Sequence, residues 1–325
     1  MNVNIKQTTS LNAQALSNSA IALENQLDAL HRLSEEAIWP VINRLSPKYR
    51  SEMAARTIAK YAPDIVAELD ALYHCKGAFY RIVRLPKLYD GDRDTLVSIQ
   101  MGILQLLRAI PLGYLEGEGR IDRPVKAIKG HENRQSTTGT RKFGPHIDHA
   151  AARFPWQPPD GRHAQPDWLL LGTVNNPKKV GTWFADPIAV YNKLVGIDEQ
   201  AALDLERSEA TLPMPPSVRP AKVAAEIPII ERDPQGMPAI RAYPRAIAET
   251  ERMERALKVL NAVLLDQALW TEIALEPGET VVARGTALHK RGPVSAEREL
   301  TAMYGREIGR HEGAVCSTYP YLEHV

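Results

Sequence analysis

The sequence predicts a mainly β protein with helical additions, built around a β-sandwich or barrel core. Apolar residues recur at helical spacing from about Ser10 to Leu72. After Gly77, short apolar or alternating runs bounded by Gly, Pro and Asn are typical of strands. Because these strands do not alternate regularly with helices, we do not expect a parallel α/β sheet.

The first part of the chain is expected to be a helical lead-in, broken at Ser46 and Pro47. Its apolar positions with helical spacing are Ile21, Leu23, Leu27, Leu30, Leu33, Ile65, Val66, Leu69 and Leu72. We therefore divide the chain into a helical region, residues 1–75, which packs on a core domain formed by residues 76–325.

The middle of the chain mixes strands, a helix and long connections. The stretch GAFYRIVRLP (77–86) alternates as a strand does, and Thr95 to Ala109 returns to helical spacing. Residues 113–145 are rich in Gly, Lys, Arg, Ser and Thr and predict long loops or a mobile flap. The run PDWLLLGTV (166–174) predicts a buried strand.

The remaining elements are short, and one long helix lies among them. Prolines predict a surface excursion at residues 200–222, and Thr250 is expected to cap a long amphipathic helix. The other expected elements are a strand in TWFADP (182–187), a helix in IAVYNKLV (188–195), two strands around the turn Asp233 to Gly236, and strand, turn, strand patterns in LEPGETVVARGTALHKRGPV (275–294) and ELTAMYGREI (299–308).

The residue composition of the chain favours a small-molecule partner. The chain has 40 basic and 39 acidic residues spread along its length, so we expect neither a nucleic-acid nor a membrane partner. Two cysteines far apart, Cys75 and Cys316, form neither a disulfide framework nor a thiolate metal site. With no secretory leader visible, we expect a cytoplasmic protein. The sequence does not indicate an oligomeric state.

The run GPHIDH (144–149) holds a possible pair of metal ligands. In an extended segment residues i and i+2 point to the same side, so His146 and Asp148 face one point and Ile147 faces away. With nine histidines and frequent acidic residues, one such pair is expected by chance. A third ligand from a distant strand would complete one face of an octahedron, as in non-haem iron oxygenases.

Three downstream residues supply what the pair lacks. Thr182 follows the turn after the buried strand, His289 lies at the end of a strand in VVARGTALHKRGPV, and Arg298 opens the next strand. With these motifs the chain resembles the iron(II)- and 2-oxoglutarate-dependent oxygenases of the clavaminate synthase and taurine dioxygenase type, over roughly residues 76–325.

The resemblance implies a distorted double-stranded β-helix, or jelly roll. It implies that His146, Asp148 and His289 bind Fe(II), and that Thr182 and Arg298 hold the far carboxylate of 2-oxoglutarate. The chemistry of these residues is compatible, because imidazole and carboxylate suit Fe(II) and a planar guanidinium binds a carboxylate through two hydrogen bonds. With O2 as co-substrate, the implied products are succinate, CO2 and an oxidised substrate.

Two departures from the family pattern keep alternatives open. The interval from His289 to Arg298 is shorter than usual in the family, which leaves Arg291 and Arg306 as other candidates for 2-oxoglutarate. We assign Arg298 because it opens a strand in phase with Leu300, Ala302 and Tyr304. Several relatives carry a second arginine for an acidic substrate group where this chain has Ala302.

The substrate is expected to be a small amino-acid-like molecule or natural product, with Gln135, Ser136 and Trp156 as candidate contacts. The resemblance places Asp148 where related halogenases commonly have a small residue, which favours hydroxylation, desaturation or oxidative cyclisation, with hydroxylation expected first. A metal-binding jelly roll without turnover and a helical scaffold with a coincidental site are the alternatives. His149 is expected to neighbour the site without binding the metal.

Overall fold

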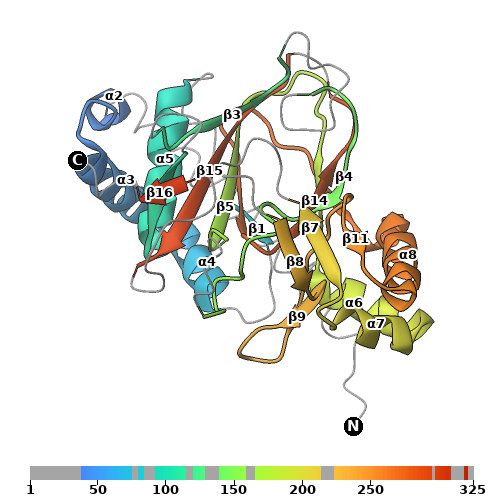
Figure 1. Ribbon diagram of the computed structural model, residues 1–325. Helices are drawn as coiled ribbons and strands as arrows, with labels where there is room; N and C mark the ends of the chain where they lie inside the picture. The colour runs from blue at the N-terminus through green and yellow to red at the C-terminus, as the bar shows by residue number, and fades with distance from the viewer. Residues whose placement is uncertain are drawn as a thin grey trace.

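The structure is a computed structural model, and its helices lie in two groups on either side of the strands (Figure 1). It describes residues 38–74, 80–83, 92–114, 120–128, 139–158, 165–213, 223–294, 297–308 and 318–320. The first group contains α2 (Ile38–Ile42), α3 (Pro47–Tyr61), α4 (Pro63–His74) and α5 (Arg93–Leu106). The second contains α6 (Pro187–Ile197), α7 (Glu199–Leu205) and α8 (Glu251–Leu265), followed by the 3-10 turn η2 (Gln267–Leu269).

The strands form two main antiparallel sheets within the described residues. The larger is seven-stranded and contains β1 (Tyr80–Val83), β13 (Thr280–Arg284), β5 (Trp168–Asn175), β15 (Glu299–Glu307), β2 (Ala109–Tyr114) and β16 (Thr318–Pro320), in this order, with β3 (Arg123–Lys126) also paired to β15. The smaller is four-stranded, in the order β12 (Thr271–Ile273), β6 (Thr182–Ala185), β14 (Leu288–Arg291) and β4 (Phe143–His146). Two minor sheets contain β11 (Ile247–Ala248), β7 (Ala210–Pro213) and β8 (Val223–Ile227), and β10 (Pro238–Ile240) with β9 (Ile230–Arg232).

The side chains of β5 explain why this strand is apolar along its length. Leu169 and Leu171 pack with Phe184 of β6 in a cluster between the two main sheets. Trp168 and Leu170 belong to another cluster, which joins the opposite face of the larger sheet to helices α3, α4 and α5. A strand buried on both faces has no polar side to alternate with.

Helix α5 lies between α3 and the larger sheet, and a glycine permits the close approach. A Cβ added at Gly102 would meet the backbone carbon of Ala54 at 2.8 Å. On the sheet side, the buried Thr301 hydroxyl of β15 donates to Gln100 Oε1 at 2.6 Å. These contacts fix the first helical group against the strand that follows Arg298.

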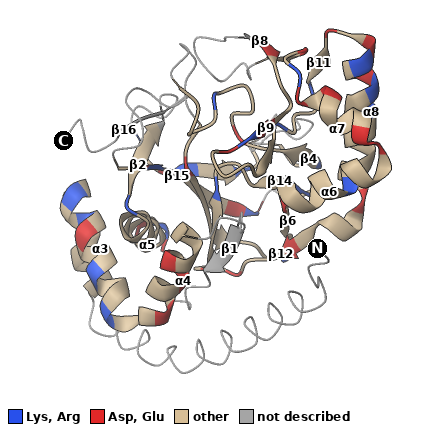
Figure 2. Cartoon of the chain, turned by 90° about the horizontal axis from the view of Figure 1, so that it is seen from below, with Lys and Arg blue, Asp and Glu red and all other residues tan. Residues whose placement is uncertain are grey.

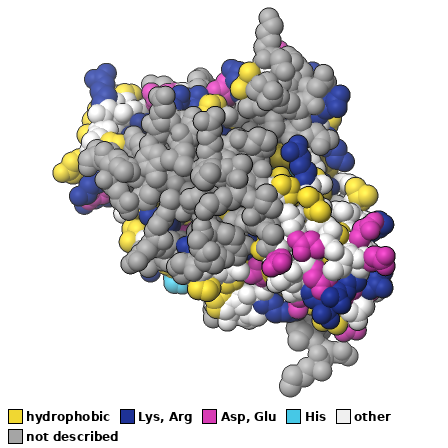
Figure 3. Space-filling model, viewed as in Figure 1, with side chains coloured by type: hydrophobic (Ala, Val, Ile, Leu, Met, Phe, Trp, Pro, Cys, Tyr) yellow, Lys and Arg dark blue, Asp and Glu magenta, His cyan; other side chains and the backbone are white. Residues whose placement is uncertain are grey.

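Helices α6, α7 and α8 cover the outer face of the smaller sheet. Leu288 of β14 packs in one cluster with Val190 of α6 and Leu260 of α8. Because successive residues of a strand face opposite sides, His289 then faces the space between the main sheets. Acidic and basic residues are interspersed along the outer helices in Figure 2, and side chains of both signs are mixed on the coloured part of the face in Figure 3.

Most elements expected from the sequence are present. The strands expected at 166–174, 182–187, 275–294 and 299–308 correspond to β5, β6, β13 with β14, and β15. The helix expected after Thr250 is α8, and the Thr250 hydroxyl accepts a hydrogen bond from the backbone N–H of Met253 at 3.3 Å.

Two predictions of irregular structure were wrong in part. Strand β3 lies within residues 113–145 and β4 overlaps their end, while strand β7 lies within residues 200–222 and helix α7 overlaps their start. The expected helix between Ser10 and Leu33, and the boundary at residue 75, lie outside the described residues. Among the helices that the structure describes, none is both long and apolar enough to cross a bilayer.

Candidate metal centre

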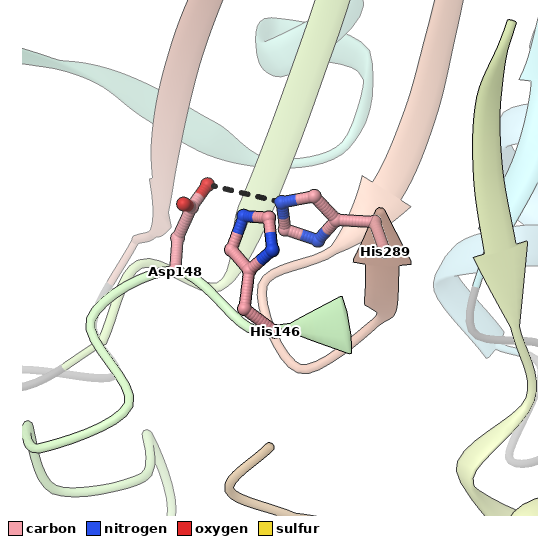
Figure 4. Close-up of side chains that lie close together, drawn as sticks. All are labelled: His146, Asp148 and His289. Carbon is pink, nitrogen blue, oxygen red and sulfur yellow. Dashed lines mark ion pairs between the residues drawn. The ribbon is translucent and has the colours of Figure 1, made fainter. Parts of the chain in front are cut away.

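Two histidines face each other across neighbouring strands. His146 ends β4, His289 lies on β14, and the two residues are direct partners in the antiparallel ladder. Their ring centroids are 4.2 Å apart. Asp148 follows β4 by two residues and turns its carboxylate toward both rings (Figure 4). One ligand atom from each of the three residues lies within 4.8 Å of the other two, a spacing that one metal ion can bridge.

Backbone carbonyls orient both imidazoles. His146 Nδ1 lies 2.7 Å from the carbonyl oxygen of Gly144, and His289 Nδ1 lies 3.0 Å from that of Ala287. A carbonyl only accepts hydrogen bonds, so each Nδ1 carries a proton, which leaves Nε2 as the nitrogen that can bind a metal. His289 Nε2 is 3.8 Å from Asp148 Oδ2, which places this nitrogen on the carboxylate side of the ring.

The electrostatics of the cluster favour the protonation states that a metal requires. Burial, and then the neighbouring His289, lowers the pKa of His146 to about 3. Burial alone would raise the pKa of Asp148, but the adjacent His289, His146 and His149 outweigh it, and a hydrogen bond from Tyr304 adds to them, so the pKa falls to about 2. Near neutral pH the cluster thus offers a neutral His146 imidazole and an ionised Asp148 carboxylate.

Aromatic rings enclose the cluster. The Phe143 ring lies 3.8 Å from the His146 ring, centroid to centroid, and the Phe184 ring lies 6.0 Å from that of His289. Both histidines are buried, with exposed fractions of 6% for His146 and 7% for His289. The two histidine rings therefore lie in a shielded environment, where charge interactions are stronger than in water, while the Asp148 side chain remains 22% exposed.

The structure also brings Thr182 and Arg298 together. Arg298 immediately precedes β15, and its Nη2 donates to the Thr182 hydroxyl at 3.1 Å. Thr182 pairs with Arg291 across β6 and β14, and the next same-face pair along these strands is Phe184 with His289. Same-face neighbours on a strand are roughly 7 Å apart, so the Thr182 hydroxyl lies one step along the sheet from His289.

The Arg298 guanidinium lacks a counter-ion in the described part of the chain. Only 4% of Arg298 is exposed, and its Nε is buried without a hydrogen-bond partner there. Burial, and then the charge of Arg291, lowers its pKa to about 10, so it stays charged at neutral pH. A buried guanidinium with an unused N–H is suited to a carboxylate ligand.

The two alternative arginines have other surroundings. Arg291 donates to the carbonyl oxygens of Gly139 at 2.7 Å and Arg141 at 3.0 Å, and so fixes the segment that leads into β4. Arg306 lies near the far end of β15, where it pairs with Ile110 of β2.

Of the three substrate candidates, the structure describes only Trp156. The Trp156 ring stacks on Phe154 at 4.7 Å and packs against the cluster formed with α6, α7 and α8. Gln135 and Ser136 lie outside the described residues. His149 has a left-handed backbone, with φ of 54°, and its ring contacts the Tyr304 ring edge-on at 5.2 Å between centroids.

Sequence reasoning missed the contacts of Tyr304 and Phe143 with the cluster. The alternation of β15 places Tyr304 on the same face as Arg298, which was a usable signal. Phe143 precedes the GPHIDH run by one residue, and no spacing rule indicates that its ring covers His146.

Comparison with known proteins identifies the fold. No protein-family model and no curated protein sequence matches the chain. Among solved structures, an asparagine oxygenase in complex with Fe(II), 2S,3S-3-hydroxyasparagine and succinate is 17% identical, with a TM-score of 0.67, over 86% of this chain and 91% of that one. The non-heme iron oxygenase OrfP in complex with Fe and alpha-ketoglutaric acid is 17% identical, with a TM-score of 0.65, over 87% and 92% of the two chains.

The chain therefore has the fold of these non-heme iron oxygenases, and the similarity extends over most of both chains. The mainly β, jelly-roll architecture predicted from the sequence is confirmed, and the resemblance seen in the motifs is confirmed at the level of the fold.

Proposed function

We propose that this protein is an iron(II)- and 2-oxoglutarate-dependent oxygenase that hydroxylates a C–H bond of a small amino-acid-like substrate. The observation that carries the proposal is the cluster of His146, Asp148 and His289 next to the hydrogen-bonded pair of Thr182 and Arg298, inside this fold. The cluster supplies ligand atoms for a metal, and the pair supplies hydrogen-bond donors for a carboxylate of a dicarboxylic acid.

In this proposal His146, Asp148 and His289 hold Fe(II). Two imidazoles and one carboxylate suit this ion, and three protein ligands leave coordination positions for a keto acid and for O2. Bound iron with 2-oxoglutarate and O2 supplies the oxidising power and yields succinate and CO2. Arg298 and Thr182 bind the far carboxylate and so orient the co-substrate toward the metal.

The substrate class follows from the structural neighbours. The asparagine oxygenase structure contains hydroxyasparagine, and OrfP structures contain hydroxylated L-Arg. A small amino-acid-like substrate is the corresponding choice for this chain. The protein itself would position one C–H bond of this substrate, and the aromatic rings around His146 and His289 would exclude water.

The test is anaerobic addition of Fe(II) and then 2-oxoglutarate, with visible absorption as the readout. We expect a new metal-to-ligand band, followed on admission of O2 by succinate formation that increases with one member of an amino-acid panel. His289→Ala should abolish the band. No band in the intact protein contradicts the proposal, and a band without succinate favours a metal-binding jelly roll that does not turn over.

A further inference from the structure

The turn after β4 determines where the Asp148 carboxylate lies. Asp148 is outside the ladder that fixes His146, and the next residue, His149, adopts a left-handed backbone. The turn is tied down by backbone hydrogen bonds from Ile147 N–H to the carbonyl of Ala242 at 3.1 Å and from Ala152 N–H to that of His149 at 2.8 Å. Any change in its path moves Asp148 relative to the two histidines.

A buried arginine next to Ala242 holds the same turn. Arg241 follows β10 and has an exposed fraction of 0%. Its Nη1 donates to the carbonyl oxygens of Ala150, at 2.6 Å, and Ala152, both within five residues of Asp148. Its Nη2 donates to Gln157 Oε1 at 3.1 Å, and the Phe154 ring lies under the guanidinium at 3.9 Å. One side chain therefore contacts the turn along its length.

The rest of the guanidinium connects the turn to the minor sheet of β9 and β10. Arg241 Nε and Nη2 both donate to Glu231 Oε1, at 3.0 and 2.8 Å. Gln157 Nε2 donates to the other oxygen of Glu231, while Gln157 Oε1 also accepts from the Phe154 N–H at 2.6 Å. All five N–H groups of the guanidinium thus have acceptors, and its charge is balanced by a carboxylate.

We propose that Arg241 is a positioning residue for the metal centre, acting with Glu231 and Gln157 to hold Asp148 in register with His146 and His289. The proposal rests on the proposed function insofar as Asp148 is a metal ligand. A lysine would keep the charge but has three donors on one atom, so it could not reach both turn carbonyls, Gln157 and Glu231 together. The turn therefore requires the several N–H donors that a planar guanidinium presents in different directions.

Arg284 offers a matched control, because it has the same kinds of contact elsewhere. Its guanidinium lies over the Trp168 ring at 4.0 Å, donates to Glu307 Oε1 at 2.7 Å and donates to the Tyr73 carbonyl at 2.8 Å. These contacts join the larger sheet to the end of α4, on the sheet face turned away from the metal cluster. Its loss should destabilise the fold without moving Asp148.

The experiment measures Fe(II) affinity by anaerobic titration calorimetry, and stability by urea unfolding with a chelator, in the same set of proteins. We expect Arg241→Lys and Arg241→Met to bind Fe(II) roughly tenfold to a hundredfold more weakly, the range found when partners of metal ligands are removed. Arg284→Met should lose comparable stability and keep the wild-type affinity. Arg241→Met removes a buried charge and can fail to fold, so Gln157→Ala serves as a second variant. It removes one hydrogen-bonding partner of Arg241 at a half-buried position and should show a several-fold loss of Fe(II) affinity.

The outcomes separate this inference from the function on which it rests. Wild-type protein that binds no Fe(II) overturns the proposed function. Wild-type protein that binds Fe(II), together with Arg241→Lys and Gln157→Ala variants of unchanged affinity, overturns the positioning role of Arg241 alone. Equal losses of affinity in the Arg241 variants and in Arg284→Met would reduce Arg241 to a general stabiliser of the fold, which also overturns it.

Discussion

Tyr304 and Arg298 place one strand in contact with both halves of the proposed site. Arg298 immediately precedes β15 and donates to Thr182, and Tyr304 lies further along the same face, where it hydrogen-bonds to Asp148. Together they link the group that would bind the co-substrate to the one carboxylate ligand.

Replacing Tyr304 with phenylalanine should weaken metal binding. The change removes a hydrogen bond to an ionised carboxylate, an interaction worth about 1.5 kcal/mol or more, so we expect the Fe(II) dissociation constant to rise roughly tenfold. Anaerobic calorimetry measures it. Tyr191→Phe is the control, because the Tyr191 hydroxyl accepts from Arg232 at 2.6 Å among the outer helices. An equal effect in both variants would argue against a specific Tyr304 contact.

Replacing Arg298 with alanine should reduce the affinity for 2-oxoglutarate and spare that for Fe(II). The half-saturating 2-oxoglutarate concentration for the visible band should rise at least tenfold, because a charge-assisted hydrogen bond is lost from a buried site. Arg306→Ala should leave it unchanged. If Arg306→Ala raises this concentration and Arg298→Ala does not, the assignment moves to Arg306.

The sequence predicts some residues of the site better than others. Period-two alternation correctly turned His146 and Asp148 to one side and Ile147 into the core, where it is buried. The adjacency of Thr182 and Arg298, which the structure shows, came from the family resemblance. Arg241 could not have been found in this way, because its partners at residues 150–157 are distant in sequence and the contact depends on tertiary packing.

The register of the smaller sheet determines that His146 and His289 face each other in the cluster. Strand β14 pairs His289 with His146 on one side and with Phe184 on the other. A slip of one residue would turn Leu288 and Lys290 inward and His289 outward, which would remove the site. The apolar contacts of Leu288 with α6 and α8 oppose such a slip.

Prolines explain why three strands were not predicted from the sequence. β3 contains Pro124, β4 contains Pro145 and β7 ends at Pro213, and each proline weakens the strand signal in the sequence. Proline is tolerated where its missing N–H needs no partner, as on edge strands. Strand β4 is the last strand in the order of its sheet, which explains how a proline-containing segment can still position His146.

The packing of α3 on α5 gives a prediction for Gly102. Gly102→Ala should lower the free energy of unfolding by about 1–3 kcal/mol, because the new methyl group would meet the backbone of Ala54 and the helices would have to separate. Urea unfolding measures the change. Gly196→Ala in α6 is the matched control, since a Cβ there has no atom within 4 Å, and it should leave stability unchanged or raise it by up to about 1 kcal/mol. Equal effects at both positions would contradict the close approach.

For the whole molecule, the buried histidine makes stability depend on pH. The pKa of His146 falls from 6.5 to about 3 on folding, so between these values the unfolded chain binds more protons than the folded one. The free energy of unfolding therefore decreases as the pH falls through this window, by about 2 kcal/mol between pH 7 and pH 5 from this group alone. Asp148 acts with the same sign below its ordinary pKa of 3.8.

Urea unfolding of the metal-free protein, with a chelator present, checks the pH dependence. The His146→Gln variant should show a shallower loss of stability on acidification than the wild type, because its side chain does not titrate. Parallel curves for the two proteins would place the pH dependence elsewhere in the molecule.

The pairing of β4 with β14 determines when the proposed metal site can form during synthesis of the chain. His146 and His289 come from opposite halves of the chain, so a growing polypeptide on the ribosome carries one histidine long before the other is made. Two side chains from the earlier segment would be a poor chelator. Metal uptake at the proposed site is then expected only after synthesis, by a chain that has already closed its smaller sheet.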